Sequence, residues 1–355
     1  MDERGNRLID IARLSGVSIG TVDRVIHERG KVSESAKNRV IQAISSLNYK
    51  PNLLARSLRL KTNLSVSVLI PDEEEDEYWN TVKEGIYSEK ENWSQYGIKI
   101  EFFTYPIQPT NLLRQKLEEF KDHNPGGFIL APVNYEISVD FLKWAAERKI
   151  PYVLFDSNIP ESNPLSFIGQ DLLASGRLAA ELIKKTTSRQ GEIAILHVDE
   201  DLGKAAYLQK KECGFMELLV DSSQRLSVYS VKPNESDTNG KIRSIIAQPD
   251  LAALFVTTSR ATSIVAEVLE AMQRTDLTFV GYDLLKENVR HLKNGVITFL
   301  INQNPRLMAR TALSYLLSDL VFHKVIPHEE YYPLDVVTQE NVDSYLRFQQ
   351  HGRPF

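Results

Sequence analysis

The chain of 355 residues is 42% hydrophobic and 25% charged, with a formal net charge of −5, which is the composition of a folded globular protein. No apolar run approaches the roughly 20 residues that a membrane helix needs, and the first residues lack the basic-then-apolar pattern of a secretory signal. One cysteine, Cys213, excludes an intramolecular disulfide and suits a reducing compartment. We therefore expect a cytoplasmic protein, long enough for two or three domains.

The charge is divided unevenly along the chain. Residues 1–63 contain 12 Lys or Arg and 6 Asp or Glu, a net charge of +6, and the remaining 292 residues contain 30 and 41, a net charge of −11, out of totals of 42 and 47. A small basic segment on a larger acidic body indicates a phosphate-backbone partner for the basic segment only.

Three stretches of helical periodicity follow one another in the basic segment, at residues 8–14, 18–26 and 33–48. The first two are joined by a three-residue turn around Gly16, and a loop through Gly30 precedes the third. Two helices joined by a short turn that contains Gly are the sequence form of a helix-turn-helix, whose second helix enters the major groove of DNA.

Apolar spacing divides this helical unit into a buried side and an exposed side. The side chains expected in its core are Ile9, Ile11, Ala12, Val17, Val22, Val25, Ile26, Val40, Ile41, Ile44 and Leu47. Ser18 and Ser33 precede the second and third helices, and we expect both to act as N-caps.

The exposed side of the second helix presents Ile19, Gly20, Asp23 and Arg24. Arg24 suits a bidentate hydrogen bond to guanine, the commonest specific base contact, although an exposed Arg can also be only a solvated charge. Because phosphates repel a carboxylate, Asp23 is expected either to orient Arg24 or to accept a hydrogen bond from a cytosine amine.

A second basic stretch, residues 50–61, contains four Lys or Arg and no acid. Pro51-Asn52 marks a helix start, and a helix from there to Leu58 is too short to be stable alone in water. We expect DNA to order it, with Leu58 as an apolar wedge in the minor groove. An ordinary interdomain linker is the alternative, but it explains neither the charge nor the helix start.

The helical unit and this hinge resemble the lactose-repressor (LacI/GalR) family of bacterial transcription regulators over residues 8–72. The matching segments are Ile11-Ala12-Arg13, Gly16-Val17-Ser18, Thr21-Val22, Arg24-Val25, Val32-Ser33 and the hinge at 50–58. The resemblance implies a homodimer on a pseudo-palindromic operator, with Leu58 as the intercalating hinge leucine. The positions that it implies at the DNA are Ser18, Ile19, Gly20, Thr21, Asp23, Arg24, Asn52, Ala55, Arg56 and Leu58. Because Asp23 replaces the commoner Ser and Gly20 has no side chain, the operator sequence of better-known members does not carry over.

From Leu64 onward, short β-rich runs alternate with helical stretches such as 171–185 and 260–274. The expected strands are Ser65–Pro71, Lys99–Tyr105, Gly127–Leu130, Tyr152–Asp156, Glu192–His197, Leu226–Tyr229, Ala253–Val256 and Thr278–Gly281. This alternation is typical of parallel sheets covered on both faces, with ligands at the carboxyl ends of the strands. So many strands exceed a comfortable single core, so we expect two lobes with a cleft between them.

Polar and aromatic side chains follow the expected strands. The candidates for ligand binding are Tyr78, Trp79, Asp156, Ser157, Thr258, Asp283 and Gln303. Aromatic faces with a few carboxylates and amides suit a neutral polyol. Each candidate also has a purely structural alternative: Tyr78 and Trp79 can be lobe core, an Asp after a strand can be a helix N-cap, and Gln303 can be a polar turn residue.

The body resembles the periplasmic-sugar-binding-like effector domain of the same family over residues 64–340. The likeness implies ligand stacking on Tyr78 and Trp79 and crossovers between the lobes near Gln170, Asn302 and Asp335. The polar ligand contacts that it implies are Asp156, Ser157, Gln209, Thr258, Asp283 and Gln303. Related sugar binders often carry Arg where Ser157 and Gln209 stand here, and Asn where Thr258 stands. A neutral sugar or derivative is therefore favoured over an anionic ligand held by two arginines.

Enzyme signatures are lacking in the sequence, which has no phosphate-binding Gly-x-x-x-x-Gly-Lys-Ser/Thr, no Gly-x-Ser-x-Gly elbow and no His-Glu-x-x-His. The seven histidines are scattered, and Cys213 is expected to be a buried small side chain without a base partner. We therefore expect no catalysis, no metal and no cofactor.

The sequence predicts an all-α helix-turn-helix head at residues 1–49, a hinge at 50–63, and a two-lobed α/β domain with parallel sheets at 64–355. The last is expected to be a periplasmic-binding-protein-like (type I) effector and dimerisation domain. The predicted function is ligand-controlled operator binding by a homodimer, as a repressor. A sugar-binding protein of a transport or sensing system is the alternative, but it predicts a signal peptide and no basic head.

Overall fold

The computed structural model describes residues 8–26, 30, 32–47, 64–74, 76–94, 96–198, 206–220, 224–232 and 237–350. The chain divides into two compact units, a helical head and an α/β body, and each is described by itself. Within the described ranges, no helix combines the length and the apolarity needed to cross a membrane.

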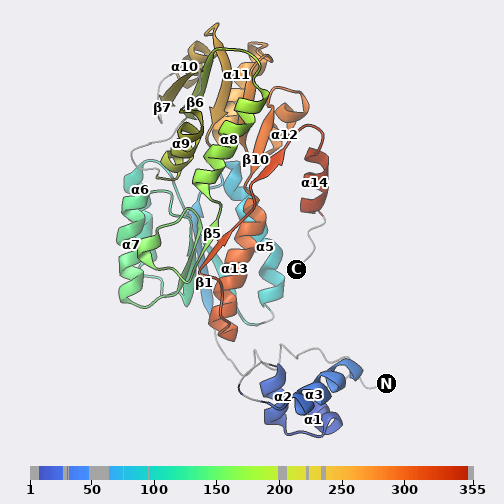
Figure 1. The fold of residues 1–355 in the computed structure, drawn as a ribbon. Helices are drawn as coiled ribbons and strands as arrows, with labels where there is room; N and C mark the ends of the chain where they lie inside the picture. Colours follow the sequence, from blue (N-terminus) through green and yellow to red (C-terminus); the bar gives the residue numbers. More distant parts are fainter. Residues whose placement is uncertain are drawn as a thin grey trace. The chain divides into compact units, whose positions relative to one another are not determined.

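The described part of the head contains three helices (Figure 1), α1 (Leu8–Ser15), α2 (Ile19–Ile26) and α3 (Glu34–Ser46). Their shared core is made of Ile11, Ala12, Val22, Val40 and Ala43, with Leu8, Val17, Val25, Ile26, Ile44 and Leu47 packed against it. The chain turns from α1 into α2 at a glycine with φ of +65°, a left-handed conformation that favours glycine. The predicted helix-turn-helix is therefore confirmed as a local structure.

Two of the expected core side chains lie at the surface instead. Ile9 is 44% exposed on α1 and Ile41 is 46% exposed on α3. Each is a near neighbour of core residues in the sequence. However, successive residues of a helix are rotated by 100° about its axis, so a neighbour of a core residue can lie outside a narrow apolar stripe. Among the described residues of the head, each helix packs against two others, so its buried stripe is narrow.

The body contains two six-stranded sheets among its described residues. The strands are β1 (Ser65–Pro71), β2 (Lys99–Tyr105), β3 (Gly127–Leu130), β4 (Tyr152–Asp156), β5 (Ser166–Gly169), β6 (Glu192–Val198), β7 (Arg225–Val231), β8 (Leu251–Val256), β9 (Thr278–Tyr282), β10 (Phe299–Asn302), β11 (Glu329–Tyr331) and β12 (Asp335–Val337). The first sheet has the order β11-β5-β4-β3-β1-β2 and the second the order β12-β10-β9-β8-β6-β7. Pairing is parallel throughout except between β10 and β12.

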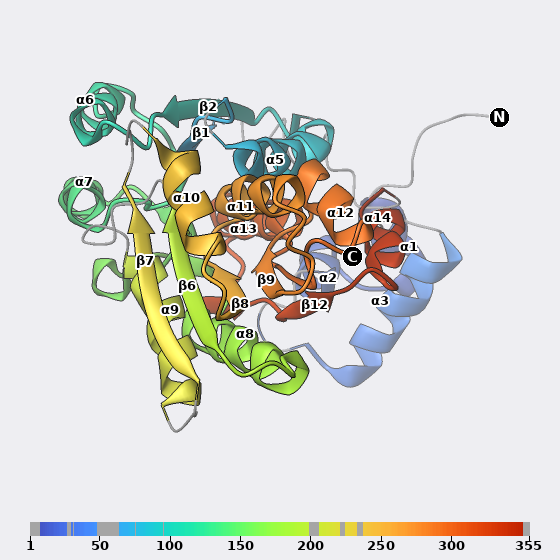
Figure 2. The same cartoon turned by 90° about the horizontal axis from the view of Figure 1, so that it is seen from above.

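Helices cover both faces of each sheet, as expected for buried parallel strands. The helices of the body are α5 (Glu77–Ser94), α6 (Thr110–Phe120), α7 (Tyr135–Glu147), a 3-10 turn η1 (Pro160–Ser162), α8 (Leu172–Thr186), α9 (Ala206–Leu219), α10 (Thr238–Ile246), α11 (Ser259–Ala271), α12 (Lys286–Lys293), α13 (Pro305–Phe322) and α14 (Val342–Gln350). We call the first sheet with α5, α6, α7, η1 and α13 the N lobe, and the second sheet with α8, α9, α10, α11, α12 and α14 the C lobe. In the N lobe, α6 and α7 pack on one face and α5 and α13 on the other (Figure 1). In the C lobe, α8 and α9 cover one face and α10, α11 and α12 the other (Figure 2).

All eight expected strands are present, with ends that differ by no more than two residues. Four further strands, β5, β10, β11 and β12, were missing from the expectation. They are short, at three or four residues, and they lie at or next to the outer edge of a sheet. Runs of that length are too brief for a two-residue alternation to stand out.

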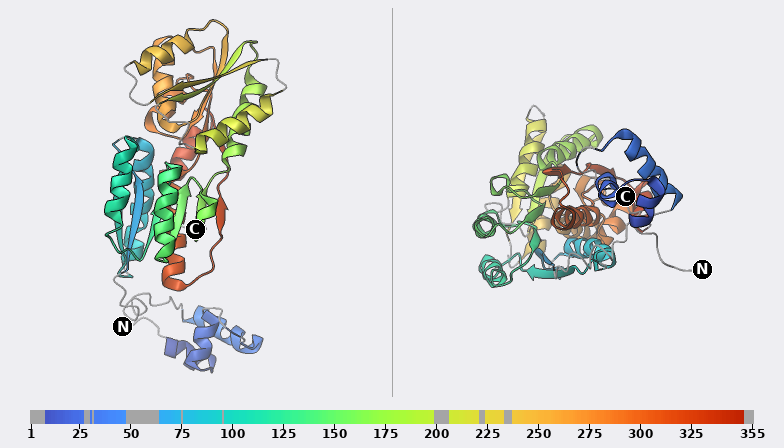
Figure 3. Two further views of the ribbon diagram at one scale, coloured as in Figure 1. Left: turned by 90° about the vertical axis from the view of Figure 1, so that its left-hand side faces the viewer. Right: turned by 90° about the horizontal axis from the view of Figure 1, so that it is seen from below.

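Three crossovers join the two lobes, from β5 to α8, from β10 to α13 and from β11 to β12 (Figure 3). They fall where the resemblance implied, near Gln170, Asn302 and Asp335. Gln170 is 3% exposed, and its amide nitrogen donates to the carbonyl oxygens of Asn302 at 3.1 Å and Pro333 at 2.7 Å. One side chain in the first crossover therefore bonds to the backbone of the other two.

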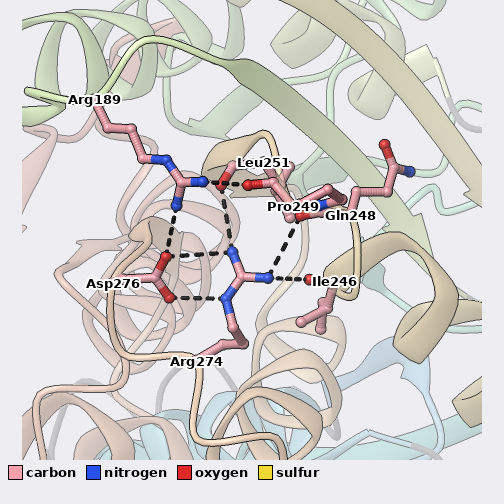
Figure 4. A network of polar contacts seen from close by, with 7 residues as sticks. All are labelled: Arg189, Ile246, Gln248, Pro249, Leu251, Arg274 and Asp276. Carbon is pink, nitrogen blue, oxygen red and sulfur yellow. Dashed lines mark hydrogen bonds and ion pairs between the residues drawn. The ribbon is translucent and has the colours of Figure 1, made fainter.

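A partly buried guanidinium, that of Arg274, connects two loops at one edge of the C lobe (Figure 4). Arg274 donates to the carbonyl oxygens of Ile246 at 2.5 Å and Leu251 at 3.4 Å, and its Nε lies 2.8 Å from a carboxylate oxygen of Asp276. Arg189 reaches the same carboxylate from α8's end of the lobe, at 2.9 Å, but its side chain is more exposed, at 45% against 19% for Arg274. Arg274 thus ties the loop between α10 and β8 to the loop between α11 and β9.

The network predicts unequal contributions from the two arginines. Arg274→Met should lower the free energy of unfolding by roughly 2 kcal/mol, because it removes charged hydrogen bonds to partly buried carbonyls. Arg189→Met is the matched control, since it loses an ion pair to the same carboxylate and a hydrogen bond to the carbonyl oxygen of Pro249. Because both interactions are more exposed, this variant should cost less than about 1 kcal/mol. Urea unfolding followed by circular dichroism measures both, and equal losses would contradict the assignment.

Candidate functional site

The N-terminus of α2 is organised by the predicted cap. The hydroxyl of Ser18 accepts a hydrogen bond from the backbone N–H of Thr21 at 3.2 Å and lies 3.0 Å from the Thr21 hydroxyl. The predicted cap of α3 is also present, because the Ser33 hydroxyl accepts from the N–H of Ala36. These bonds satisfy N–H groups that a helix start leaves without partners.

The side of α2 away from the core presents the side chains predicted to read DNA. Ile19, Gly20 and Arg24 are exposed, while Thr21 and Asp23 are partly buried. The Nε of Arg24 donates to the carbonyl oxygen of Gly20 at 3.1 Å, one turn back. This bond holds the guanidinium along the exposed face of the helix and leaves its terminal nitrogens to face outward.

The hinge predicted at the DNA minor groove lies outside the described residues. This applies to four of the predicted DNA contacts, Asn52, Ala55, Arg56 and Leu58. They remain predictions from the sequence.

In the body, equivalent strands of the two lobes end in the same way. Asp156 ends β4 in the N lobe and Asp283 follows β9 in the C lobe, and the two strands hold the same place in their sheets. Both aspartates have a positive φ, +70° and +58°. Asp tolerates this left-handed conformation better than most residues, and such backbone strain is common at ligand sites.

The described residues enclose a cavity of about 60 Å³ between the carboxyl ends of the two sheets. Its lining consists of Asp76, Tyr78, Trp79, Ile107, Val133, Asp156 and Ser157 from the N lobe, and Leu172, Tyr207, Lys211, Thr258, Ser259 and Gln303 from the C lobe. The structure therefore brings together six of the predicted ligand residues, namely Tyr78, Trp79, Asp156, Ser157, Thr258 and Gln303. The cavity is smaller than the roughly 150 Å³ that holds benzene in an engineered protein core, so a monosaccharide requires the lobes to move apart.

The aromatic wall comes from the first turn of α5. Tyr78 and Trp79 pack edge to face with ring centroids 4.9 Å apart, and Trp79 also meets Phe155 at 6.2 Å. The hydroxyl of Tyr78 donates to Asp156 at 2.7 Å. Burial raises the pKa of Asp156, and the Tyr78 hydrogen bond opposes that rise by favouring the charged carboxylate. Both rings are thus lobe core and cavity wall at once.

Asp283 lies directly behind the cavity, 1% exposed. Its carboxylate accepts hydrogen bonds from the Ser259 hydroxyl and from the backbone N–H and side-chain amide of Gln303, each of the latter at 2.7 Å. Burial raises its pKa, and these three donors oppose the rise. Asp283 therefore fixes two lining residues, and one of them, Gln303, belongs to the crossover between β10 and α13.

Lys211 is a lining residue that the sequence reading missed. It is 3% exposed, donates to the carbonyl oxygen of Thr257 at 3.1 Å, and lies 3.6 Å from the ring centroid of Tyr282. Its position depends on the tight packing of α9 on α8, where a side chain at Gly176 would collide with the backbone of Lys211. The signal available was that glycine in α8, because a helical glycine often marks a close approach.

Gln209, predicted as a ligand contact, is exposed on α9 and is not among the lining side chains. It stands two residues before Lys211, and two residues span about 200° around a helix. The two side chains therefore leave the helix on nearly opposite sides.

Two further expectations need comment. Cys213 was expected to be buried, but it is exposed, with its sulfur 3.7 Å from a carboxylate oxygen of Glu217. Thr258 also has a structural role beside its place in the cavity, because its hydroxyl caps α11 by accepting from the N–H of Ala261. No group of three or more His, Cys, Asp or Glu side chains is arranged to hold a metal ion in the part of the chain that the structure describes.

Asp76 is another charged lining residue absent from the sequence candidates. It precedes α5, and its Oδ1 accepts from the N–H of Tyr78 at 2.9 Å. Burial raises its pKa to about 6, with smaller contributions from the charges of Asp283 and Asp156 and an opposing one from Arg260. Its second oxygen accepts no hydrogen bond from a described residue, so it is the carboxylate oxygen of the cavity best placed for a ligand.

Comparison with known proteins gives matches to both units. A sequence model of "Bacterial regulatory proteins, lacI family" matches residues 7–52, and one of "Periplasmic binding protein domain" matches residues 66–321. A sucrose operon repressor from Streptococcus mutans is 33% identical over 179 residues, or 50% of this chain and 52% of that protein. A ribose operon repressor from Halalkalibacterium halodurans is 26% identical over 280 residues, covering 77% of this chain and 79% of the other. The crystal structure of a LacI transcriptional regulator from Bacteroides fragilis has a TM-score of 0.75 and 26% identity, covering 80% of this chain and all of that one.

The raised pKa of Asp76 makes the stability of the unliganded protein depend on pH. Because the folded value of about 6 exceeds the ordinary 3.8, the folded state gains from the proton on Asp76 at low pH, and this gain is lost as pH rises from about 4 to about 6. Asp76→Asn, which preserves a good N-cap, should therefore raise the free energy of unfolding at pH 7.5 by roughly 2–3 kcal/mol.

The same variant should change the unfolding free energy little at about pH 3, where the carboxyl group is mostly protonated in both states. Asp72→Asn is the control, since Asp72 also accepts a backbone N–H bond, from Glu74, but does not line the cavity. Urea titrations across the pH range provide the measurement. A stabilisation of Asp76→Asn that is the same at both pH values would refute the ionisation argument.

Proposed function

Because the chain belongs to the lacI family of bacterial regulatory proteins, we propose that it is a sequence-specific repressor whose operator affinity is set by a sugar or sugar derivative bound between the two lobes. The observation that carries the proposal is the presence, in one chain, of a helix-turn-helix head and a two-lobed body with a polar, aromatic-walled cavity. Relatives named as repressors of sucrose and ribose operons support a carbohydrate as the effector.

On the DNA side, we propose that α2 enters the major groove and that Arg24 reads one base of each half-site. Its hydrogen bond to the Gly20 carbonyl supports this, because it pre-orients the guanidinium and so lowers the entropy lost on binding. The proposed surface comprises Ser18, Ile19, Gly20, Thr21, Asp23 and Arg24, extended by Asn52, Ala55, Arg56 and Leu58 of the hinge. We further propose a cytoplasmic homodimer on a pseudo-palindromic site, with a head at 1–49, a hinge at 50–63 and an effector domain at 64–355.

On the ligand side, we propose that Tyr78 and Trp79 stack on the effector while Asp156, Ser157, Thr258 and Gln303 bind its hydroxyl groups. Asp283 acts through Ser259 and Gln303. Gln209 is retained only as a residue at the rim, since its side chain is exposed.

Coupling between ligand and DNA follows from the path of the backbone. Gln303, which we propose to bind the ligand, is hydrogen-bonded to Asp283 and stands in the crossover between β10 and α13. A change in the cavity therefore acts directly on a crossover segment, and the crossovers set the angle between the lobes. A ligand shifts the balance between two lobe arrangements only by its difference in affinity for them. A coupling of about 1–3 kcal/mol would change operator affinity roughly 5- to 150-fold.

A binding protein for sugar transport is the competing function, because it would use the same two-lobed body. The match of residues 7–52 to a family of DNA-binding regulators favours the repressor. The two functions separate experimentally. Full-length protein incubated with genomic fragments at low salt should retain a small set of fragments, and retention should change on addition of a sugar that binds the body. If no fragment is retained with or without sugars, the repressor proposal fails.

Arg24→Ala should relax base preference at one position of each half-site, at a cost of about 1–3 kcal/mol for the preferred base. Binding to a library of operator variants measures the change. Arg39→Ala on the exposed surface of α3 is the control, and it should alter all sequences alike or none. A uniform loss of affinity in Arg24→Ala would make Arg24 a phosphate contact instead.

A further inference from the structure

The cavity holds more negative than positive charge among the described residues. Asp76 and Asp156 line it, Asp283 lies directly behind it, and Lys211 is the cation of the lining. The three carboxylates are close enough to affect one another, since the charges of Asp156 and Asp283 both raise the pKa of Asp76. A ligand bound there therefore enters a field that favours positive charge.

The hydrogen bonds of the three carboxylates show which of them remains available to a ligand. Asp283 accepts from Ser259 and twice from Gln303, so its oxygens are occupied by neutral donors. Asp156 accepts from the hydroxyls of Tyr78 at 2.7 Å and Ser157 at 3.4 Å. Asp76 has one bond, from the backbone N–H of Tyr78, and its second oxygen receives none from a described residue.

The lysine does not cancel this excess. Lys211 donates to the carbonyl oxygen of Thr257 and lies over the ring of Tyr282, two partners that belong to the C lobe behind the cavity. It acts at a distance on Asp156 and Asp283. The cation that affects Asp76 is Arg260, which is exposed in the first turn of α11, does not line the cavity and offsets only part of the rise in the pKa of Asp76. The N-lobe side of the cavity is thus a carboxylate beside two aromatic rings, Tyr78 and Trp79.

A carboxylate beside aromatic faces is the chemistry that holds an ammonium group, through an ion pair and through attraction to the ring faces. We infer that the effector is an aminated monosaccharide, with its ammonium group against Asp76 and the Tyr78–Trp79 wall and its hydroxyls toward the C-lobe side of the cavity. This inference rests on the proposed function of the cavity as the effector site. It goes beyond a neutral sugar, which offers nothing to offset the charge of Asp76.

The buried carboxylate gives the bound state a second signature. Burial raises the pKa of Asp76 to about 6 in the unliganded protein, and a neighbouring ammonium group lowers it again. Binding of an amine between pH 5 and 6 should therefore release protons. Binding of a neutral sugar has no comparable cause to release them.

The test uses full-length protein and matched sugars at pH 7.5 by titration calorimetry. Glucosamine, galactosamine and mannosamine are each compared with the parent hexose and with the N-acetyl derivative, which keeps the shape but loses the charge. At least one amine should bind ten-fold or more tightly than both of its partners, and proton release between pH 5 and 6 should accompany binding. A parent hexose or N-acetyl derivative that binds as tightly as its amine, or failure of all three amines to bind, would overturn the inference.

Two variants locate the ammonium group. Asp76→Asn should reduce the ratio of amine affinity to parent-sugar affinity ten-fold or more, whereas Asp72→Asn should leave that ratio unchanged. Loss of affinity for amine and parent alike in Asp76→Asn would show a structural role only and would contradict the placement. A neutral sugar that binds tightly and alters operator binding would sink this inference while leaving the repressor function intact.

Discussion

The hydrogen bonds of one buried carboxylate, Asp283, hold the ligand cavity and the crossovers in one arrangement. A carboxylate that is 1% exposed would be costly to ionise without partners. Its three donor groups come from two residues: the hydroxyl of Ser259, the first residue of α11, and the backbone N–H and side-chain amide of Gln303, which follows β10. Because these donors are also cavity wall and interlobe connection, the ligand site cannot change shape without affecting the path of the chain between the lobes.

The two lobes place an aspartate at the same position in their sheets but surround it with different hydrogen-bond partners. Asp156 and Asp283 end equivalent strands in the same left-handed conformation. Asp283 is enclosed by donors of its own lobe, whereas Asp156 is bonded by Tyr78 and Ser157 at the edge of the cavity. The C lobe therefore provides a rigid polar floor, and the N lobe provides the groups that remain open to a ligand. Because of this asymmetry, a ligand can bind first to the N lobe, and the C lobe can then close on it.

Much of the architecture was predictable because it depends on pattern. Buried parallel strands such as β1, β6 and β8 are rich in apolar residues, and the caps Ser18 and Ser33 precede clear helical periods. The cavity was harder to predict, because its residues are set by rotation and packing. Lys211 reaches the cavity only because Gly176 lets α8 and α9 approach closely, and Gln209 points away because of its phase on the same helix. Asp76 was missed because an acidic loop before a helix has the appearance of an ordinary cap. Cys213 was assigned to the core from its residue type alone, and residue type does not reveal the phase of a helix.

The amide of Gln170 has a mechanical consequence. The three crossover segments that connect the two lobes could in principle bend and twist independently of one another. When one side chain in the first is bonded to the backbone of the other two, those movements become correlated. The motion that this coupling favours is opening and closing of the two lobes as whole bodies. A protein whose lobes move together in this way has two distinct shapes, one with ligand in the cleft and one without. Switching a gene on and off requires such a pair of shapes in the protein that senses the ligand.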